Sequence, residues 1–144
     1  MSTDDLVETF ARFPDRFAQA ARAAETQPLP EGEWDPSDIA RHLIAVEREV
    51  WWTRFASIVN EDEPHWSWTE PGLEPGLDGL PLGAILERFA AARARSVTIL
   101  DGFDAAAWAR TGVHATYGRL DAVGLLRIVT DHDAEHLASL STDD

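Results

Sequence analysis

Two histidines near the end of the sequence, His132 and His136, lie four residues apart in the stretch LLRIVTDHDAEHLASL. In an α-helix this spacing places the two imidazoles about 40° apart around the axis and one turn apart along it, so both project from one patch. Leu125, Val129 and Leu140 share this face, so we expect it to point into the core. Two imidazoles at this spacing can share a metal ion, although a solvated face or hydrogen-bonded core imidazoles are also consistent with it.

A third imidazole, His42, lies in an earlier helical stretch beside Leu43 and Val46. It belongs to the second turn of its helix, whereas His132 and His136 belong to the last turns of theirs. If the two helices run antiparallel, all three imidazoles lie at the same end of the fold. Three neutral nitrogen ligands leave a coordination position open, as in catalytic zinc sites. We therefore predict a divalent metal site at these three residues, with zinc or nickel as the first choice and iron or manganese as alternatives.

A metal-bound imidazole usually donates its second ring N–H to a carboxylate or a backbone carbonyl. Asp38 lies one turn before His42, and Glu49 lies two turns after it on nearly the same face. We predict that Asp38 and Glu49 orient His42 in this way, with solvated surface carboxylates as the alternative. His65 and His114 fall in predicted loops and are expected to be ordinary exposed residues, of which only His114 is a candidate to reach the site. The sequence identifies no catalytic acid, base or nucleophile.

Four stretches with helical spacing of apolar residues must position these histidines. They cover about 4–25, 36–60, 81–103 and 122–140. Asp35 and Asp121 are suitable N-caps for the second and fourth stretches, and Pro14 should kink or restart the first. No strand pattern of useful length appears. We therefore predict an all-α fold in which residues 1–144 form a single domain, an antiparallel four-helix bundle.

The charged residues of the predicted helices are assigned to solvent, because those of the third helix are read as its polar face and the carboxylates beside the histidine pair have helical angles that put them mostly to the side. Among the arginines, two in the second helix are also candidates to steer an anionic substrate. The set comprises Arg41, Arg48, Glu87, Arg88, Arg93 and Arg95 and, at the sides of the histidine pair, Asp131, Asp133 and Glu135.

Residues 61–79 form a loop of about twenty residues, a length that in compact domains indicates a functional or mobile segment. Trp66 and Trp68 within it are typical of a lid or a subunit interface, or of simple packing over the end of the bundle. The loop is also long enough for a crossover instead of a hairpin connection. Trp51 and Trp52 point about 100° apart on one helix, so one of them is expected to line a pocket or an oligomer contact.

The composition restricts the classes of partner. The chain has 12 basic and 26 acidic residues, and the formal net charge of −14 repels nucleic-acid phosphates and anionic lipid headgroups. No secretory signal pattern is found, and no apolar run approaches the roughly 20 residues of a membrane-spanning helix. We therefore expect a cytoplasmic protein with a small-molecule substrate and with no nucleic-acid or membrane partner. Because the chain has no cysteine, any thiol chemistry requires an external thiol.

The order of these segments resembles the DinB-like superfamily of metalloenzymes, also called DinB/YfiT-type, over nearly the whole chain. Its most specific stretches are a Trp-x-Pro-x-x-x-x-x-His-Leu pattern at residues 34–43 and a His-Asp-x-x-His-Leu pattern at residues 132–137. The resemblance implies a four-helix bundle and a divalent metal held by His42, His132 and His136. It also implies, for some members, a thiol cosubstrate of the mycothiol or bacillithiol type, and it is compatible with a homodimer through helix faces.

Four functions are consistent with these features. The leading hypothesis is an enzyme that transfers a low-molecular-weight thiol, bound to the metal as thiolate, to an electrophilic small molecule. The alternatives are a metal-dependent hydrolase that uses metal-bound hydroxide, a non-catalytic stress protein that binds a metal or small ligand, and a bundle with structural histidines. A transferase should require added thiol and a hydrolase should not. A binding protein should give no product, and a structural bundle should remain free of metal.

Overall fold

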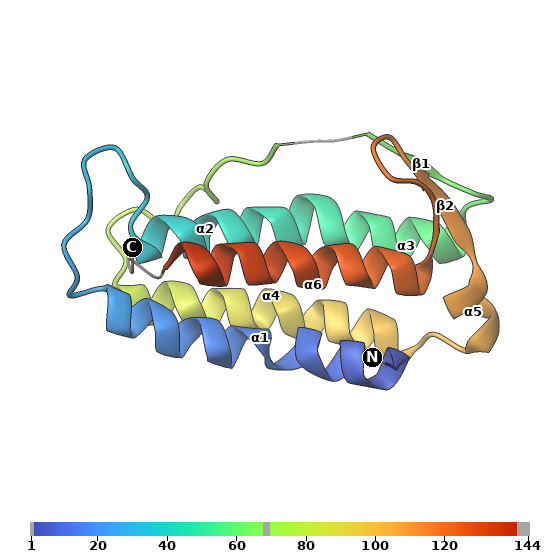
Figure 1. Cartoon of the computed structure of the whole chain (residues 1–144), viewed down its shortest axis with the longest axis horizontal. Helices are drawn as coiled ribbons and strands as arrows, with labels where there is room; N and C mark the ends of the chain where they lie inside the picture. Colours follow the sequence, from blue (N-terminus) through green and yellow to red (C-terminus); the bar gives the residue numbers. More distant parts are fainter. Residues whose placement is uncertain (1, 68–69, 141–144) are drawn as a thin grey trace.

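A computed structural model describes residues 2–67 and 70–140 of the chain. Four long helical segments pack side by side, and a small sheet and a short helix cover one end of them (Figure 1). The helical segments are α1 (Thr3–Ala24), the run of α2 (Pro36–Val46), η1 (Glu47–Trp51) and α3 (Trp52–Asn60), α4 (Leu82–Asp101) and α6 (Ala122–Ser139); the end elements are β1 (His65–Trp66), α5 (Ala105–Ala109), β2 (Thr111–His114) and β3 (Gly118–Asp121). The predicted all-α four-helix bundle is confirmed.

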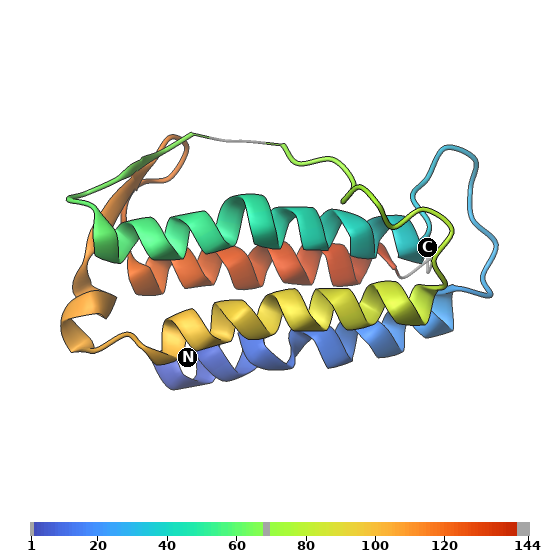
Figure 2. The same cartoon turned by 180° about the vertical axis from the view of Figure 1, so that it is seen from behind.

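The long connection between α3 and α4 is a crossover. It leaves the end of the bundle where β1 lies and reaches the opposite end, where α4 begins (Figures 1 and 2). As a result α2 and α4, which pack against each other, run in the same direction, while α1 and α6 run in the opposite one. The bundle is therefore antiparallel between α1 and α4 and between α2 and α6. Within the described residues, no helix is both long enough and apolar enough to cross a membrane.

The second helical segment is continuous from residue 36 to residue 60 but contains the π-helical turn η1. Its start is fixed by a capping box, in which the Asp35 carboxylate accepts the Asp38 backbone N–H at 2.7 Å and the Asp38 carboxylate accepts the Asp35 backbone N–H at 3.2 Å. A π-turn inserts one residue and so rotates the residues that follow it relative to those before. Glu47 and Trp51, which begin and end the turn, are both buried.

Two apolar clusters fill the bundle, and a charged side chain lies between them. Phe10 and Phe55 belong to the first cluster, and Phe17 and Phe89 belong to the second. The guanidinium of Arg93 lies 4.0 Å from the ring centroid of Phe10 and 5.3 Å from that of Phe89. Arg93 is only 1% exposed, so the core of this bundle contains a buried cation at its centre.

Pro14 lies inside α1 without ending it. Because proline has no N–H, the carbonyl of Phe10, four residues earlier, loses its helical donor. Arg93 on α4 supplies a replacement, since its Nη1–H donates to the Phe10 carbonyl at 2.9 Å. The helix therefore continues as one segment and does not restart at the proline.

The three-stranded sheet is absent from the sequence prediction, because strands of two and four residues are too short for an alternating pattern to be recognised. β1 pairs in parallel with β2, which pairs antiparallel with β3. Trp66 on β1 is buried, and its indole N–H donates to the Ser57 hydroxyl at 2.9 Å. Of the roles considered for Trp66, simple packing over the bundle end is the observed one. Trp68 lies outside the described residues.

Candidate metal centre

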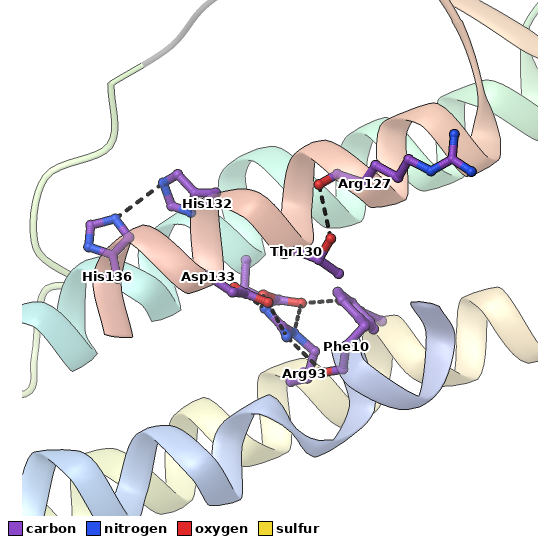
Figure 3. Close-up of polar contacts among 9 residues, drawn as sticks. Phe10, Arg93, Arg127, Thr130, His132, Asp133 and His136 are labelled. Carbon is purple, nitrogen blue, oxygen red and sulfur yellow. Dashed lines mark hydrogen bonds and ion pairs between the residues drawn. The ribbon is translucent and has the colours of Figure 1, made fainter. Parts of the chain in front are cut away.

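Three histidines converge at the end of the bundle where α2 begins and α6 ends. One ring nitrogen from each of His42, His132 and His136 can be chosen so that all three lie within 4.8 Å of one another. The Nε2 atoms of His132 and His136 are 3.2 Å apart and face each other (Figure 3). Two nitrogens bound to one zinc ion at a tetrahedral angle lie about 3.4 Å apart. The spacing of the imidazole pair therefore fits a shared metal ion.

The third imidazole is oriented by the crossover. The Nδ1 atom of His42 lies 3.2 Å from the carbonyl oxygen of Gly72. Because a carbonyl only accepts hydrogen bonds, Nδ1 carries the proton and Nε2 keeps its lone pair for a ligand. Neither carboxylate predicted for this role occupies it: Asp38 caps its own helix, and Glu49 is exposed on η1. Side-chain spacing could not reveal the correct partner, because the partner is a backbone atom.

The protonation state of the pair suits metal binding. Burial is the main factor that lowers the pKa of His132 to about 3 and that of His136 to about 4, and positive charge on neighbouring imidazoles lowers both further. Both rings are therefore neutral at pH 7, and the neutral ring is the form that binds metals. A donor set of imidazoles without carboxylates or thiolates is suited to zinc, nickel, copper and iron.

One nitrogen of the group has no partner. The Nδ1 atom of His132 is buried and forms no hydrogen bond with the described residues. An unsatisfied buried polar group costs about 1–3 kcal/mol, and here it lies in a group of three imidazoles. The binding free energy of a metal ion held by the three imidazoles would offset such a cost, so the residues present fit a metal site.

A cavity of about 270 Å³, the metal-site cavity, opens beside the histidines. Two indoles border it: the ring centroid of Trp34 lies 5.0 Å from that of His42, and Trp51 meets His132 edge to face at 5.6 Å. Of the adjacent tryptophans, Trp51 is thus the one that lines this cavity, as expected for one of the two. The residues that line the metal-site cavity are Trp34, His42, Val46, Val50, Trp51, Glu70, Pro71, His132, Glu135 and His136.

The sequence matches the DinB superfamily over residues 2–140. The chain belongs to the DinB superfamily. Among solved structures it is similar to YfiT from Bacillus subtilis, described as "a probable metal-dependent hydrolase with an unusual four-helix bundle topology". That match has a TM-score of 0.72 and 17% identity and covers 97% of this chain and 86% of YfiT, so it establishes the fold alone. No protein with a curated function matches the sequence.

In this DinB-superfamily bundle, the helices that carry the three histidines are joined by a buried ionic cluster. Three N–H groups of Arg93 donate to the Asp133 carboxylate and the Phe10 carbonyl at 2.9 Å (Figure 3). Its other two N–H groups donate to the Glu47 carboxylate at 3.0 Å. Ser96 also donates to Glu47, at 2.5 Å. The assignment of Arg93 and Asp133 to solvent is therefore wrong, because each is buried with a complete set of opposite charges or hydrogen bonds.

The cluster fixes the position of the histidines. Asp133 directly follows His132 on α6, and Glu47 follows His42 by five residues on the α2–η1 run. Burial raises the pKa of Asp133 to about 6, although Arg93 acts in the opposite direction. Burial also acts to lower the pKa of Arg93, but Glu47 and Asp133 outweigh it and raise the pKa above its ordinary value. At neutral pH a charged Arg93 therefore holds the two histidine-bearing segments in register.

The other two histidines lie elsewhere. His65 is exposed on β1, as expected. His114 is buried on β2, which contradicts its expected exposure, and its Nδ1 accepts the backbone N–H groups of Thr116 and Tyr117 at 2.9 and 3.2 Å. It therefore stabilises the turn between β2 and β3 and is not a member of the converging group.

Proposed function

We propose that this protein is a divalent-metal-dependent enzyme that joins a low-molecular-weight thiol, of the mycothiol or bacillithiol type, to an electrophilic small molecule. The observation that carries the proposal is the convergence of three imidazoles, without a carboxylate or thiolate among them, at the edge of a cavity. Such a donor set leaves at least one coordination position for an exogenous ligand.

The roles of the chain's residues follow from their positions. His42, His132 and His136 would hold the metal, and the Gly72 carbonyl would keep the His42 ring in the ligating tautomer. A divalent metal bound there supplies Lewis acidity, which lowers the pKa of a thiol or water beside it. In the transfer, the thiol loses its proton to solvent, its sulfur forms a bond to the electrophilic carbon, and the leaving group departs with the bonding electrons.

The lining of the metal-site cavity indicates the class of electrophile. Trp34, Trp51 and two valines provide apolar walls, and the only charged side chains among the lining residues are Glu70 and Glu135. A cavity with acidic residues and without arginine repels anions. We therefore infer that the electrophile is apolar and either neutral or cationic.

Metal content is the first test. Untagged protein from metal-supplemented culture should contain about one divalent ion per chain by inductively coupled plasma mass spectrometry, as a three-histidine site requires. His132→Ala should lose the ion. His65→Ala, which removes an exposed histidine outside the group, should retain it. Wild-type protein that binds neither zinc nor nickel when these are added would exclude the proposal.

The second test separates transfer from hydrolysis. Metal-loaded protein should convert an aromatic electrophile such as 1-chloro-2,4-dinitrobenzene to the thiol adduct only when mycothiol or bacillithiol is added, as followed by mass spectrometry. His132→Ala should abolish this conversion. Adduct formation at the uncatalysed rate in wild-type protein would contradict thiol transfer.

A metal-dependent hydrolase is the second candidate, and the likeness to YfiT, described as a probable metal-dependent hydrolase, is the observation that favours it. The same metal site would then activate water. Metal-dependent cleavage of an ester or amide panel in the absence of thiol, lost in His132→Ala, would support this candidate over thiol transfer.

A further inference from the structure

A second and larger cavity, of about 560 Å³, lies between the α2–η1–α3 run and α4. These two segments pack side by side along the face seen in Figure 2. The metal-site cavity is bordered by α6 instead, so the two cavities use different faces of the α2–η1–α3 run. We call the second cavity the arginine groove; it is lined by Ile44, Arg48, Trp52, Glu74, Pro75, Gly76, Leu77, Arg88, Ala91, Ala92 and Arg95.

The groove concentrates positive charge in a strongly acidic protein. Three of the chain's 12 basic residues line it, against one acidic residue, although the chain has 26 acidic residues in all. Arg48 forms an ion pair with that acidic residue, Glu74. Arg88 and Arg95 form no ion pair with any described residue. Three other cavities, all bordered by Trp34, have no arginine or lysine in their linings.

The spacing along α4 creates a recess between two cations. Arg88 and Arg95 are seven residues apart, so they lie on one face and about 10 Å apart along the axis. The positions between them on this face are Ala91 and Ala92, whose small side chains leave the floor open. A ligand in the recess would therefore contact apolar surface below and a guanidinium at each end.

The side of the arginine groove that faces α4 is formed by an indole, that of Trp52, which is fixed in position. The Nε1–H of Trp52 donates to the Ala92 carbonyl at 3.1 Å, which ties the ring to α4. The Arg95 guanidinium lies 4.3 Å from the Trp52 ring centroid, within cation–π range. Stacking on the indole limits the conformations of Arg95, so less conformational entropy is lost when it binds an anion.

The loop that closes one end of the groove is also held in place. The backbone N–H of Glu74 donates to the Arg41 carbonyl at 3.2 Å, and the Glu74 carbonyl accepts from the Arg41 side chain at 3.0 and 3.3 Å. Arg41 further pairs with Asp78 at 3.0 Å. Arg41 and Arg48, which sequence reasoning considered for steering a substrate, therefore build this groove and do not line the metal-site cavity.

We propose that the arginine groove is a second ligand site, which binds a small organic carboxylate with an apolar, planar body. The carboxylate would pair with Arg88 or Arg95, whose guanidinium groups match the two oxygens of a carboxylate. The planar body would lie on the alanine floor beside Trp52 and Leu77. This site is independent of the proposed chemistry at the histidines.

The probe for this site is 1-naphthoate, and 1-naphthamide, which has the same shape without the charge, is its matched control. In titrations followed by two-dimensional NMR of the tryptophan indole N–H groups, naphthoate should shift the Trp52 signal saturably and the amide should not. Arg88→Gln/Arg95→Gln should weaken naphthoate binding at least tenfold. Both side chains are exposed, so the double variant keeps the core intact. Arg127→Gln, at an exposed arginine on α6, should bind like the wild type.

A carboxylate could also bind a metal, so the titration is repeated with His136→Ala, which removes an imidazole that forms no hydrogen bond with the described residues of the groove's loop. Unchanged naphthoate affinity in this variant supports the groove, whereas loss of binding assigns the ligand to the metal-site cavity and overturns the proposal. Equal affinity for naphthoate and naphthamide, equal affinity in the double variant, or the absence of a saturable Trp52 shift would each overturn it as well. So would binding of an acidic peptide, such as hexaglutamate, at a concentration where naphthoate does not bind.

Discussion

At the scale of single residues, the buried Arg93 allows two carboxylates and one backbone carbonyl to lie in the core of the bundle with a hydrogen-bond partner. A guanidinium has five donors, and here all five are taken up by three groups, the Glu47 carboxylate, the Asp133 carboxylate and the Phe10 carbonyl. One of these acceptors, the Phe10 carbonyl, is free because of Pro14. The proline and the arginine are thus complementary, although they lie in different helices and far apart in the sequence.

This arrangement predicts the effect of removing the cation. Arg93→Met should lower the free energy of unfolding by about 3–5 kcal/mol, because Glu47 and Asp133 would remain buried without a counter-charge. Urea denaturation followed by circular dichroism measures the change. Arg95→Met, on the exposed side of the same helix, is the control and should alter the free energy by no more than about 0.5 kcal/mol. A loss below about 1 kcal/mol in Arg93→Met would mean that the carboxylates are solvated.

The positions of Arg93 and Asp133 could have been read from the sequence. Arg93 follows Phe89 by four residues and precedes Leu100 by seven, and Asp133 follows Val129 by four. These spacings place both residues on the core-facing side. The prediction instead read Arg93 as part of a polar helix face and Asp133 as lying to the side of the histidine pair. It failed because opposite charges from three helices meet at one point inside the bundle.

At the scale of elements, the helices were predictable and the small sheet was not. Caps such as Asp35 and Asp121, together with long apolar repeats, locate the helix ends, and both residues accept the expected backbone N–H. β1 has two residues and is defined by its pairing with β2, which lies more than 40 residues later in the chain. Such a pairing has no local signal. The Gly72 carbonyl beside His42 went unpredicted for the same reason.

The contact between the sheet and the bundle, made through Trp66, gives a second prediction. A Cβ atom at Gly112 would lie 2.3 Å from the Trp66 ring, which is itself held by Ser57. Gly112→Ala should therefore lower the free energy of unfolding by about 1–3 kcal/mol. Gly83→Ala is the control, because a Cβ there meets only the end of a flexible arginine at 3.9 Å. In a helix this change should be neutral or stabilise by up to about 1 kcal/mol.

The stability of the sheet and of its contact with the bundle should also depend on pH. Glu63 accepts two hydrogen bonds from Arg119 on β3, and these bonds, with a further one from Thr111, lower its pKa from 4.5 to about 2. A carboxyl with a depressed pKa stabilises the fold fully above its unfolded value, and this contribution is lost as the pH falls from 4.5 towards 2. Carbon-13 NMR titration of the Glu63 carboxyl should give a midpoint near 2. A midpoint near 4.5 in wild-type protein, or no upward shift in Arg119→Gln, would contradict the pairing.

At the scale of the whole molecule, the net charge complicates any test of metal binding. With 26 acidic residues and a formal net charge of −14, the surface attracts divalent cations without a specific site. Weak binding of this kind is screened by salt, whereas a buried three-histidine site is not. A specific site must therefore be distinguished by its dependence on the imidazoles and by its insensitivity to ionic strength.

Thermal unfolding makes this distinction, because a metal that binds only the folded chain stabilises it by about 2.7 kcal/mol at a free concentration of 100 Kd. For a chain of this size the rise in Tm on addition of zinc should be roughly 4–10 °C. The ion would link α2 to α6 through His42 and His136, so the rise should persist in 0.5 M salt and be reversed by a chelator. His136→Gln should abolish the rise, and His65→Gln should keep it. An equal rise in both variants, removed by salt, would assign the stabilisation to the acidic surface.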